Sequence, residues 1–164
     1  MRASTPFELR VTYSSRIAPT IVQVLADLPD FLREPILRKK LREFYTYDES
    51  GKRETISAAV IATSYIEAAK LHALVKTWLE ILSEFDADKV VMIFRMYCEE
   101  FLKRPEGLEN LKKPWFIDSL LTLDENKKQK LSDCLIEATF IVPNRHNIIK
   151  MMPDYLAKVL EKNS

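Results

Sequence analysis

Glycine is nearly absent from this chain: Gly51 and Gly107 are the only two in 164 residues. A chain of ordinary composition contains about 7% glycine. Glycine supplies the positive-φ backbone conformations that tight hairpins, phosphate-binding loops and strained catalytic turns require. The sequence therefore predicts a mostly helical domain whose connections are made by proline and polar capping residues.

Apolar residues recur at the three- and four-residue spacing of amphipathic helices, and these segments end at prolines or capping residues. Hydrophobic residues make up 47% of the sequence, enough to bury a core without disulfides or metals. We expect one all-α domain over residues 1–164, a bundle of about seven helices. The expected helices span 15–28, 35–44, 54–85, 87–104, 115–121, 125–142 and 154–161.

The segment 54–85 is the longest of these and is apolar over much of its circumference. It is either one helix or two, because Ser64 followed by Glu67 matches a capping box. We expect it to pair with 87–104 at the centre of the bundle. In 125–142 the side chains expected to face the core are Leu131, Cys134, Leu135, Ala138, Ile141 and Val142.

Residues 7–13 depart from the helical pattern, because apolar and polar side chains alternate there as in a half-buried strand. Residues 1–15 are therefore predicted to be an extended arm or a minor β-strand. A strand needs a partner for its backbone groups, and a hairpin over 44–56, turning at Asp48–Gly51, is one candidate. The other candidate is a second protomer. The alternative for 44–56 is an irregular loop.

The charges nearly cancel, because 25 Lys and Arg residues face 24 Asp and Glu residues for a net charge of +1. Proteins that coat nucleic acids or membranes are usually more one-sided. The most apolar long stretch, 56–85, still contains six charged or histidine side chains, which excludes a simple membrane span. Residues 1–16 carry four charges and no apolar core, unlike a signal peptide. We expect a cytoplasmic protein with no membrane partner.

Side chains suited to catalysis or metal binding are scarce. His72 and His146 match neither the Glu-x-x-His spacing of di-iron bundles nor the paired ligands of zinc sites. Cys98 and Cys134 lie in apolar helical patterns, where burial raises the pKa of a thiol and lowers its reactivity. No nucleophile elbow or glycine-rich phosphate loop occurs. The sequence predicts no catalytic residue, metal ligand or cofactor and favours a protein that is not an enzyme.

The sharpest local signal is a basic cluster over 33–42, with five cations and one carboxylate. Cations gathered on one helix could bind the phosphates of a nucleic acid, with Tyr45 and Tyr47 nearby to stack on bases. The alternative, which we favour, is the solvent-facing side of an amphipathic helix, paired with Glu34 and Glu43. The candidate nucleic-acid-binding residues are Arg33, Arg38, Lys39, Lys40 and Arg42.

Three functions are consistent with these patterns. The absence of catalytic motifs and the broad apolar faces of several helices favour a non-enzymatic interaction or assembly protein. Such a protein binds a protein partner or itself, and we expect a homodimer. The second hypothesis is a nucleic-acid-binding accessory subunit that uses the basic helix. The third is an enzyme or small-molecule binder with a pocket between helices.

Overall fold

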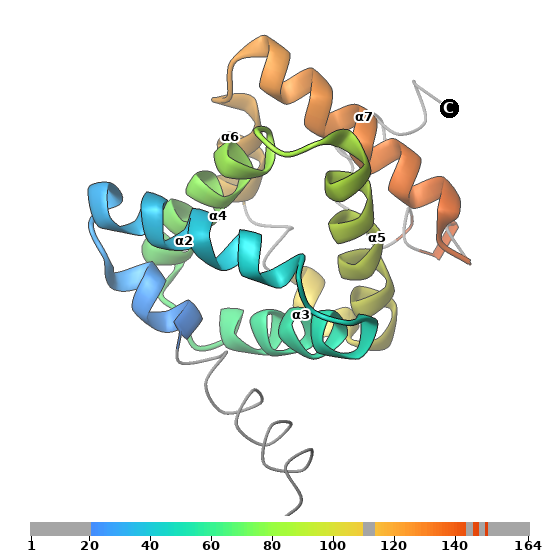
Figure 1. Cartoon of the computed structure of the whole chain (residues 1–164), viewed down its shortest axis with the longest axis horizontal. Helices are drawn as coiled ribbons and strands as arrows, with labels where there is room; N and C mark the ends of the chain where they lie inside the picture. Colours follow the sequence, from blue (N-terminus) through green and yellow to red (C-terminus); the bar gives the residue numbers. More distant parts are fainter. Residues whose placement is uncertain (1–20, 110–113, 144–145, 148–149, 151–164) are drawn as a thin grey trace, which may run out of the picture.

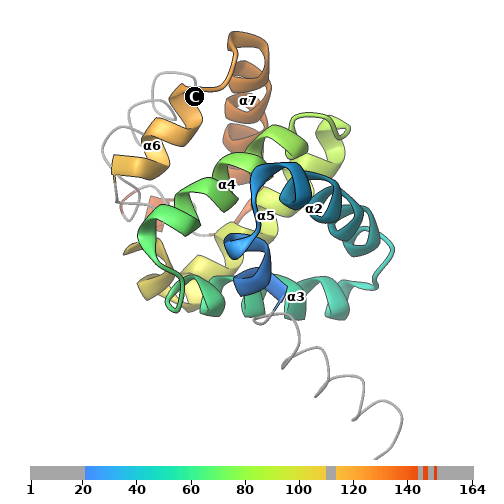
Figure 2. The same ribbon diagram turned by 90° about the vertical axis from the view of Figure 1, so that its left-hand side faces the viewer.

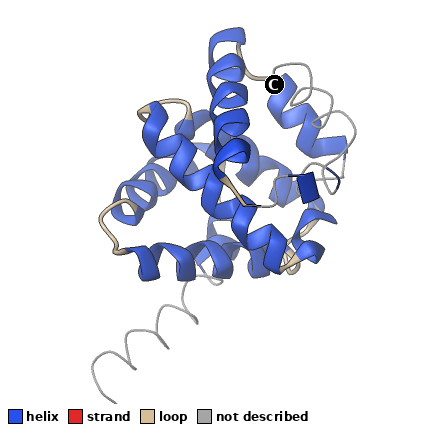
Figure 3. Ribbon diagram, turned by 90° about the vertical axis from the view of Figure 1, so that its right-hand side faces the viewer, coloured by secondary structure: helices blue, strands red, loops and turns tan. Residues whose placement is uncertain are grey.

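The computed structural model of the chain describes residues 21–109, 114–143, 146–147 and 150. The expected all-α fold is confirmed, because these residues form helices and loops and no strand (Figure 3). The predicted arm or strand at 1–15 and the predicted helix at 154–161 lie outside the described residues. After a helix that ends at residue 27, the elements are α2 (Asp30–Phe44), α3 (Glu49–Thr63), α4 (Ala68–Leu82), α5 (Ala87–Lys103), the 3-10 helix η1 (Pro105–Glu109), α6 (Pro114–Leu121) and α7 (Glu125–Ile141).

The helices pack around a shared apolar core. α5 packs across α7 and also contacts α3, whereas α4 packs against α2 and α6 (Figure 1, Figure 2). We expected the main partner of α5 to be the preceding helical segment, but α7 takes that place. None of the described helices has the length and apolar character needed to cross a membrane. The largest fully buried apolar side chains are Ile81, Leu82, Met96, Leu131 and Val90.

The predicted hairpin over 44–56 is wrong, because this segment contains the end of α2, a short connection and the start of α3. The Asp48 carboxylate accepts a hydrogen bond from the backbone N–H of Gly51 at 2.8 Å, which is a helix N-cap. A short polar run with a glycine begins helices as well as turns. The packing of the segment that follows determines which of the two forms, and here that segment is the helix α3, which lies against α5 and η1.

The long segment 54–85 contains two helices, as the second of our two interpretations expected, because α3 ends at Thr63 and α4 begins at Ala68. The predicted capping box is wrong. Ser64 closes the C-terminus of α3, where its N–H donates to the carbonyl of Ile61. Glu67 is the N-cap of α4 and forms no side-chain capping bond. The two residues therefore belong to the ends of different helices.

α2 begins at Asp30 and passes through Pro35, where the sequence predicted its first residue. Proline has no N–H, so the helix lacks the bond that would reach the carbonyl of Phe31. Arg33 holds the first turn instead. Its buried guanidinium donates to the carbonyls of Leu25 and Leu28 and pairs with Asp30 at 2.5 Å. These bonds tie α2 to the end of the preceding helix and offset the missing backbone bond.

Candidate functional site

α2 carries two kinds of exposed side chain in succession. Its first half exposes Phe31, Leu32 and Ile36, at 76%, 40% and 40% of their areas. Its second half exposes the cations Lys39 and Arg42. Residues three and four positions apart share one side of a helix, so these side chains form a stripe along α2. We call these five residues the α2 outer face.

Two of the five predicted nucleic-acid-binding residues are held in internal bonds. Arg33 is only 4% exposed and bonds to backbone carbonyls, so it is a structural residue. The Arg38 guanidinium donates to both carboxylate oxygens of Glu84 at 3.1 Å and to one carboxylate oxygen of Glu34 at 2.9 Å. The hydrogen bonds to Glu84, followed by the bond to Glu34, raise the pKa of Arg38.

The remaining three cations are nearer to solvent. Lys40 lies 3.3 Å from the carboxylate of Glu43, as the amphipathic-helix interpretation expected. Within the described part of the chain, Lys39 and Arg42 form no ion pair and no side-chain hydrogen bond. These two therefore remain available to an acidic partner.

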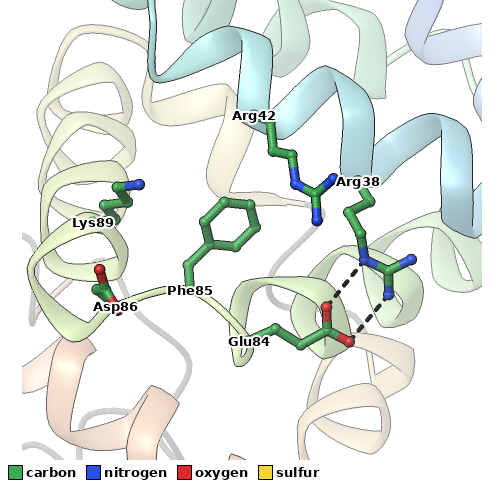
Figure 4. Close-up of a pocket in the computed structure, with 6 residues that line it drawn as sticks. All are labelled: Arg38, Arg42, Glu84, Phe85, Asp86 and Lys89. Atoms are coloured by element: carbon green, nitrogen blue, oxygen red, sulfur yellow. Dashed lines mark hydrogen bonds and ion pairs between the residues drawn. The ribbon is translucent and has the colours of Figure 1, made fainter.

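A shallow hollow of about 240 Å³ lies between the second half of α2 and the connection from α4 to α5 (Figure 4). Arg42 reaches toward it from α2, and Lys89 stands on its far side, on α5 (Figure 4). The Lys89 ammonium lies 5.9 Å from the centre of the Phe85 ring, a cation–π contact. With Arg38 and Glu84 paired, the lining keeps two cations, Arg42 and Lys89, against one carboxylate, Asp86, which leaves a small positive excess. Its lining is Arg38, Arg42, Glu84, Phe85, Asp86 and Lys89.

The two tyrosines proposed to stack on bases are committed to the domain itself. The hydroxyl of Tyr45 donates to the backbone carbonyl of Lys89 at 2.8 Å, and its ring packs on Phe44 and Phe85. Burial raises the pKa of Tyr45. Tyr47 meets Phe44 edge-on, with ring centres 6.4 Å apart. Both rings are half-buried and pack against aromatic neighbours of the same domain.

The candidate nucleophiles lie in apolar surroundings. Cys98 is buried, and desolvation raises the pKa of its thiol to about 12. Burial also raises the pKa of Cys134. Neither thiol is activated, since a reactive cysteine needs a lowered pKa. No group of three or more potential metal ligands occurs in the residues that the structure describes.

A second stripe, which the sequence did not reveal, lies on the exposed side of α7. The prediction that Ile141 faces the core is wrong: it is 52% exposed, whereas Val142 beside it is buried. Asp133 and Glu137 are also exposed. The three residues Asp133, Glu137 and Ile141 are four positions apart and share one side of the helix. We call these three residues the α7 outer face, and the four-residue spacing is the signal that could have identified it.

Comparisons with protein-family models, curated proteins and solved structures found no match to this chain.

Proposed function

We propose that this chain is a non-enzymatic helical interaction protein that binds a protein partner on the α2 outer face. The observation that carries the proposal is the 76% exposure of Phe31 on a regular helix beside Leu32 and Ile36. Burying a side chain of this size is worth about 1.5–3 kcal/mol, and a protein partner that covers Phe31 would gain that free energy. Aromatic residues and arginine are enriched at the centres of protein interfaces.

The second half of the same face supports a partner that carries carboxylates. Lys39 and Arg42 follow the apolar residues along α2 and have no ion-pair partner among the described residues. Unpaired cations at the rim of an apolar contact attract and orient an acidic partner, and they add specificity more than affinity. An acidic, partly apolar protein surface therefore fits the α2 outer face along its whole length.

The test compares Phe31→Glu with Tyr65→Glu, a matched control that adds the same charge at another aromatic residue, 74% exposed. Sedimentation velocity measures self-association, and a pull-down with the immobilised chain measures the binding of other proteins. We expect Phe31→Glu to abolish the association or capture that the wild-type and control chains show. Equal behaviour of the two variants, or no association and no capture by the wild type, would contradict the proposal.

Nucleic-acid binding through 33–42 remains the second candidate. Its support is now the pair Lys39 and Arg42, together with Lys89 across the hollow, because Arg33 and Arg38 are held in internal bonds. A gel-shift titration over salt concentration tests it. Phosphate contacts give affinity that falls steeply as salt rises, and Lys39→Glu/Arg42→Glu removes them. No shift at low salt would end this candidate.

A further inference from the structure

We infer that the partner of the α2 outer face is the α7 outer face of a second copy of this chain. This inference rests on the proposed function and specifies its partner. Both faces are exposed, and both combine an apolar end with an end of unpaired charge. The charge on α2 is positive and the charge on α7 is negative.

The order of the two ends along each helix fixes the direction of pairing. α2 is apolar in its first half and basic in its second half, whereas α7 has Asp133 and Glu137 first and Ile141 last. Antiparallel packing therefore places Ile36 against Ile141 and cation against carboxylate. Parallel packing would place apolar residues against charges at both ends.

The spacings on the two helices agree when Ile36 faces Ile141. At 1.5 Å per residue, Lys39 and Arg42 lie about 4.5 and 9 Å farther along α2. Glu137 and Asp133 lie about 6 and 12 Å back along α7. The distance along the helix axis between each cation and its facing carboxylate is therefore small compared with the length of a lysine or arginine side chain. In this register Lys39 meets Glu137 and Arg42 meets Asp133, whereas Leu32 and Phe31 lie about 6 and 7.5 Å on the other side of Ile36, past the end of α7 at Ile141.

The two carboxylates of α7, like the two cations of α2, form no ion pair among the described residues. Among the described residues, Glu137 has no ion pair, and Asp133 accepts only the amide of Gln129 at 2.8 Å. The second half of α2 also borders the hollow, where Arg42 and Lys89 stand on either side of Phe85 (Figure 4). A carboxylate entering from the other copy would meet these two cations beside one carboxylate of the lining, Asp86.

The pairing joins two copies because α2 and α7 lie apart within one copy (Figure 1, Figure 2). Such a contact between two different surfaces closes into a two-fold dimer if it forms twice in one pair, and into a larger assembly otherwise. Each face is only a few side chains wide, so we expect the small interface of a weak, reversible association, below about 1,200 Å².

The test uses two double variants with opposite charge changes, Lys39→Glu/Arg42→Glu and Asp133→Lys/Glu137→Lys. Each double variant by itself has the same sign of charge on its α2 and α7 outer faces, so we expect it to be monomeric by sedimentation velocity. Their equimolar mixture is expected to associate, because each variant face then meets its complement. Lys76→Glu/Lys103→Glu changes charge at two exposed lysines elsewhere and is expected to associate like the wild type. Circular dichroism melting checks that every variant is folded.

Failure of this inference can be told apart from failure of the proposed function. A wild-type chain that stays monomeric, or double variants that associate unchanged, overturns the α2–α7 pairing. So does a folded pair of variants that stays monomeric on mixing. If a different protein is still bound in a Phe31-dependent manner, the proposed function stands. If association persists and Phe31→Glu does not weaken it, the proposed function fails as well.

Discussion

At the scale of single residues, Arg33 shows how little charge alone says about exposure. Its side chain is 4% exposed and bonds to the carbonyls of Leu25, Ala26 and Leu28. The last carbonyls of a helix have no partner within the helix, and a basic side chain satisfies them well. Arg33 therefore replaces backbone donors at the junction before α2, although it belongs to the basic cluster in the sequence.

We expect Arg33→Ala to lower the free energy of unfolding by about 3 kcal/mol, because it removes the guanidinium donors to the carbonyls of Leu25, Ala26 and Leu28. Urea denaturation followed by circular dichroism measures the change. Lys39→Ala on the same helix is the control and should stay within about 0.5 kcal/mol of the wild type. Equal stability of the two variants would show that Arg33 has no structural role.

The buried thiol of Cys98 predicts a loss of stability in alkali. Its pKa is raised from 9.0 to about 12 in the folded chain, so the unfolded state releases this proton first. The contribution of Cys98 to the free energy of unfolding should therefore be fully present below pH 9.0 and fall above it, and Tyr45 and Tyr97, whose pKa values burial also raises, add to the fall. Urea denaturation across this range should give a shallower fall for Cys98→Ala. If the free energy of unfolding of Cys98→Ala fell with pH as steeply as that of the wild type, the raised pKa of Cys98 would be contradicted.

At the scale of elements, local signals identified which segments are helical more accurately than they located the helix ends. Pro35 looked like a first residue of α2, and Ser64 looked like the start of α4. In both cases the residue type was compatible with a helix start. The packing of neighbouring elements determined where the helix begins, because a cap is worth only about 1 kcal/mol.

η1 depends on the absence of a side chain at Gly107. A Cβ added there would lie 2.7 Å from Cγ1 of Val60 and 3.2 Å from the ring of Phe101. We expect Gly107→Ala to lower the free energy of unfolding by about 1–3 kcal/mol, because η1 must move away from α3 and α5. A double-mutant cycle with Val60→Ala, measured by thermal denaturation, should show that the two costs are less than additive. Full additivity would contradict the close approach.

At the scale of the whole molecule, a net charge of +1 conceals two small charged faces of opposite sign. Association through these faces should weaken as salt rises, because the screening length falls from about 10 Å at 0.1 M salt to about 3 Å at 1 M. Sedimentation velocity at increasing salt measures this. Lys76→Glu/Lys103→Glu should follow the same curve as the wild type. Association that strengthens with salt would indicate a purely apolar contact.

The sequence by itself determined the fold class and most of the helices. Scarce glycine and helical apolar spacing are local properties, and each helix satisfies its own backbone hydrogen bonds. The bounds of the segment 87–104 were predictable for the same reason. For α7 the local pattern left Thr122 or Asp124 as the cap, and Asp124 takes that place.

Only the tertiary structure decided which side chains remain uncovered. Arg33 is buried, whereas Lys39 and Arg42 from the same basic run stay exposed, and Ile141 faces outward beside a buried Val142. Exposure depends on neighbours that are distant along the chain, and no local pattern encodes their positions. The candidate docking faces are therefore a product of packing, because they consist of what the other helices leave open.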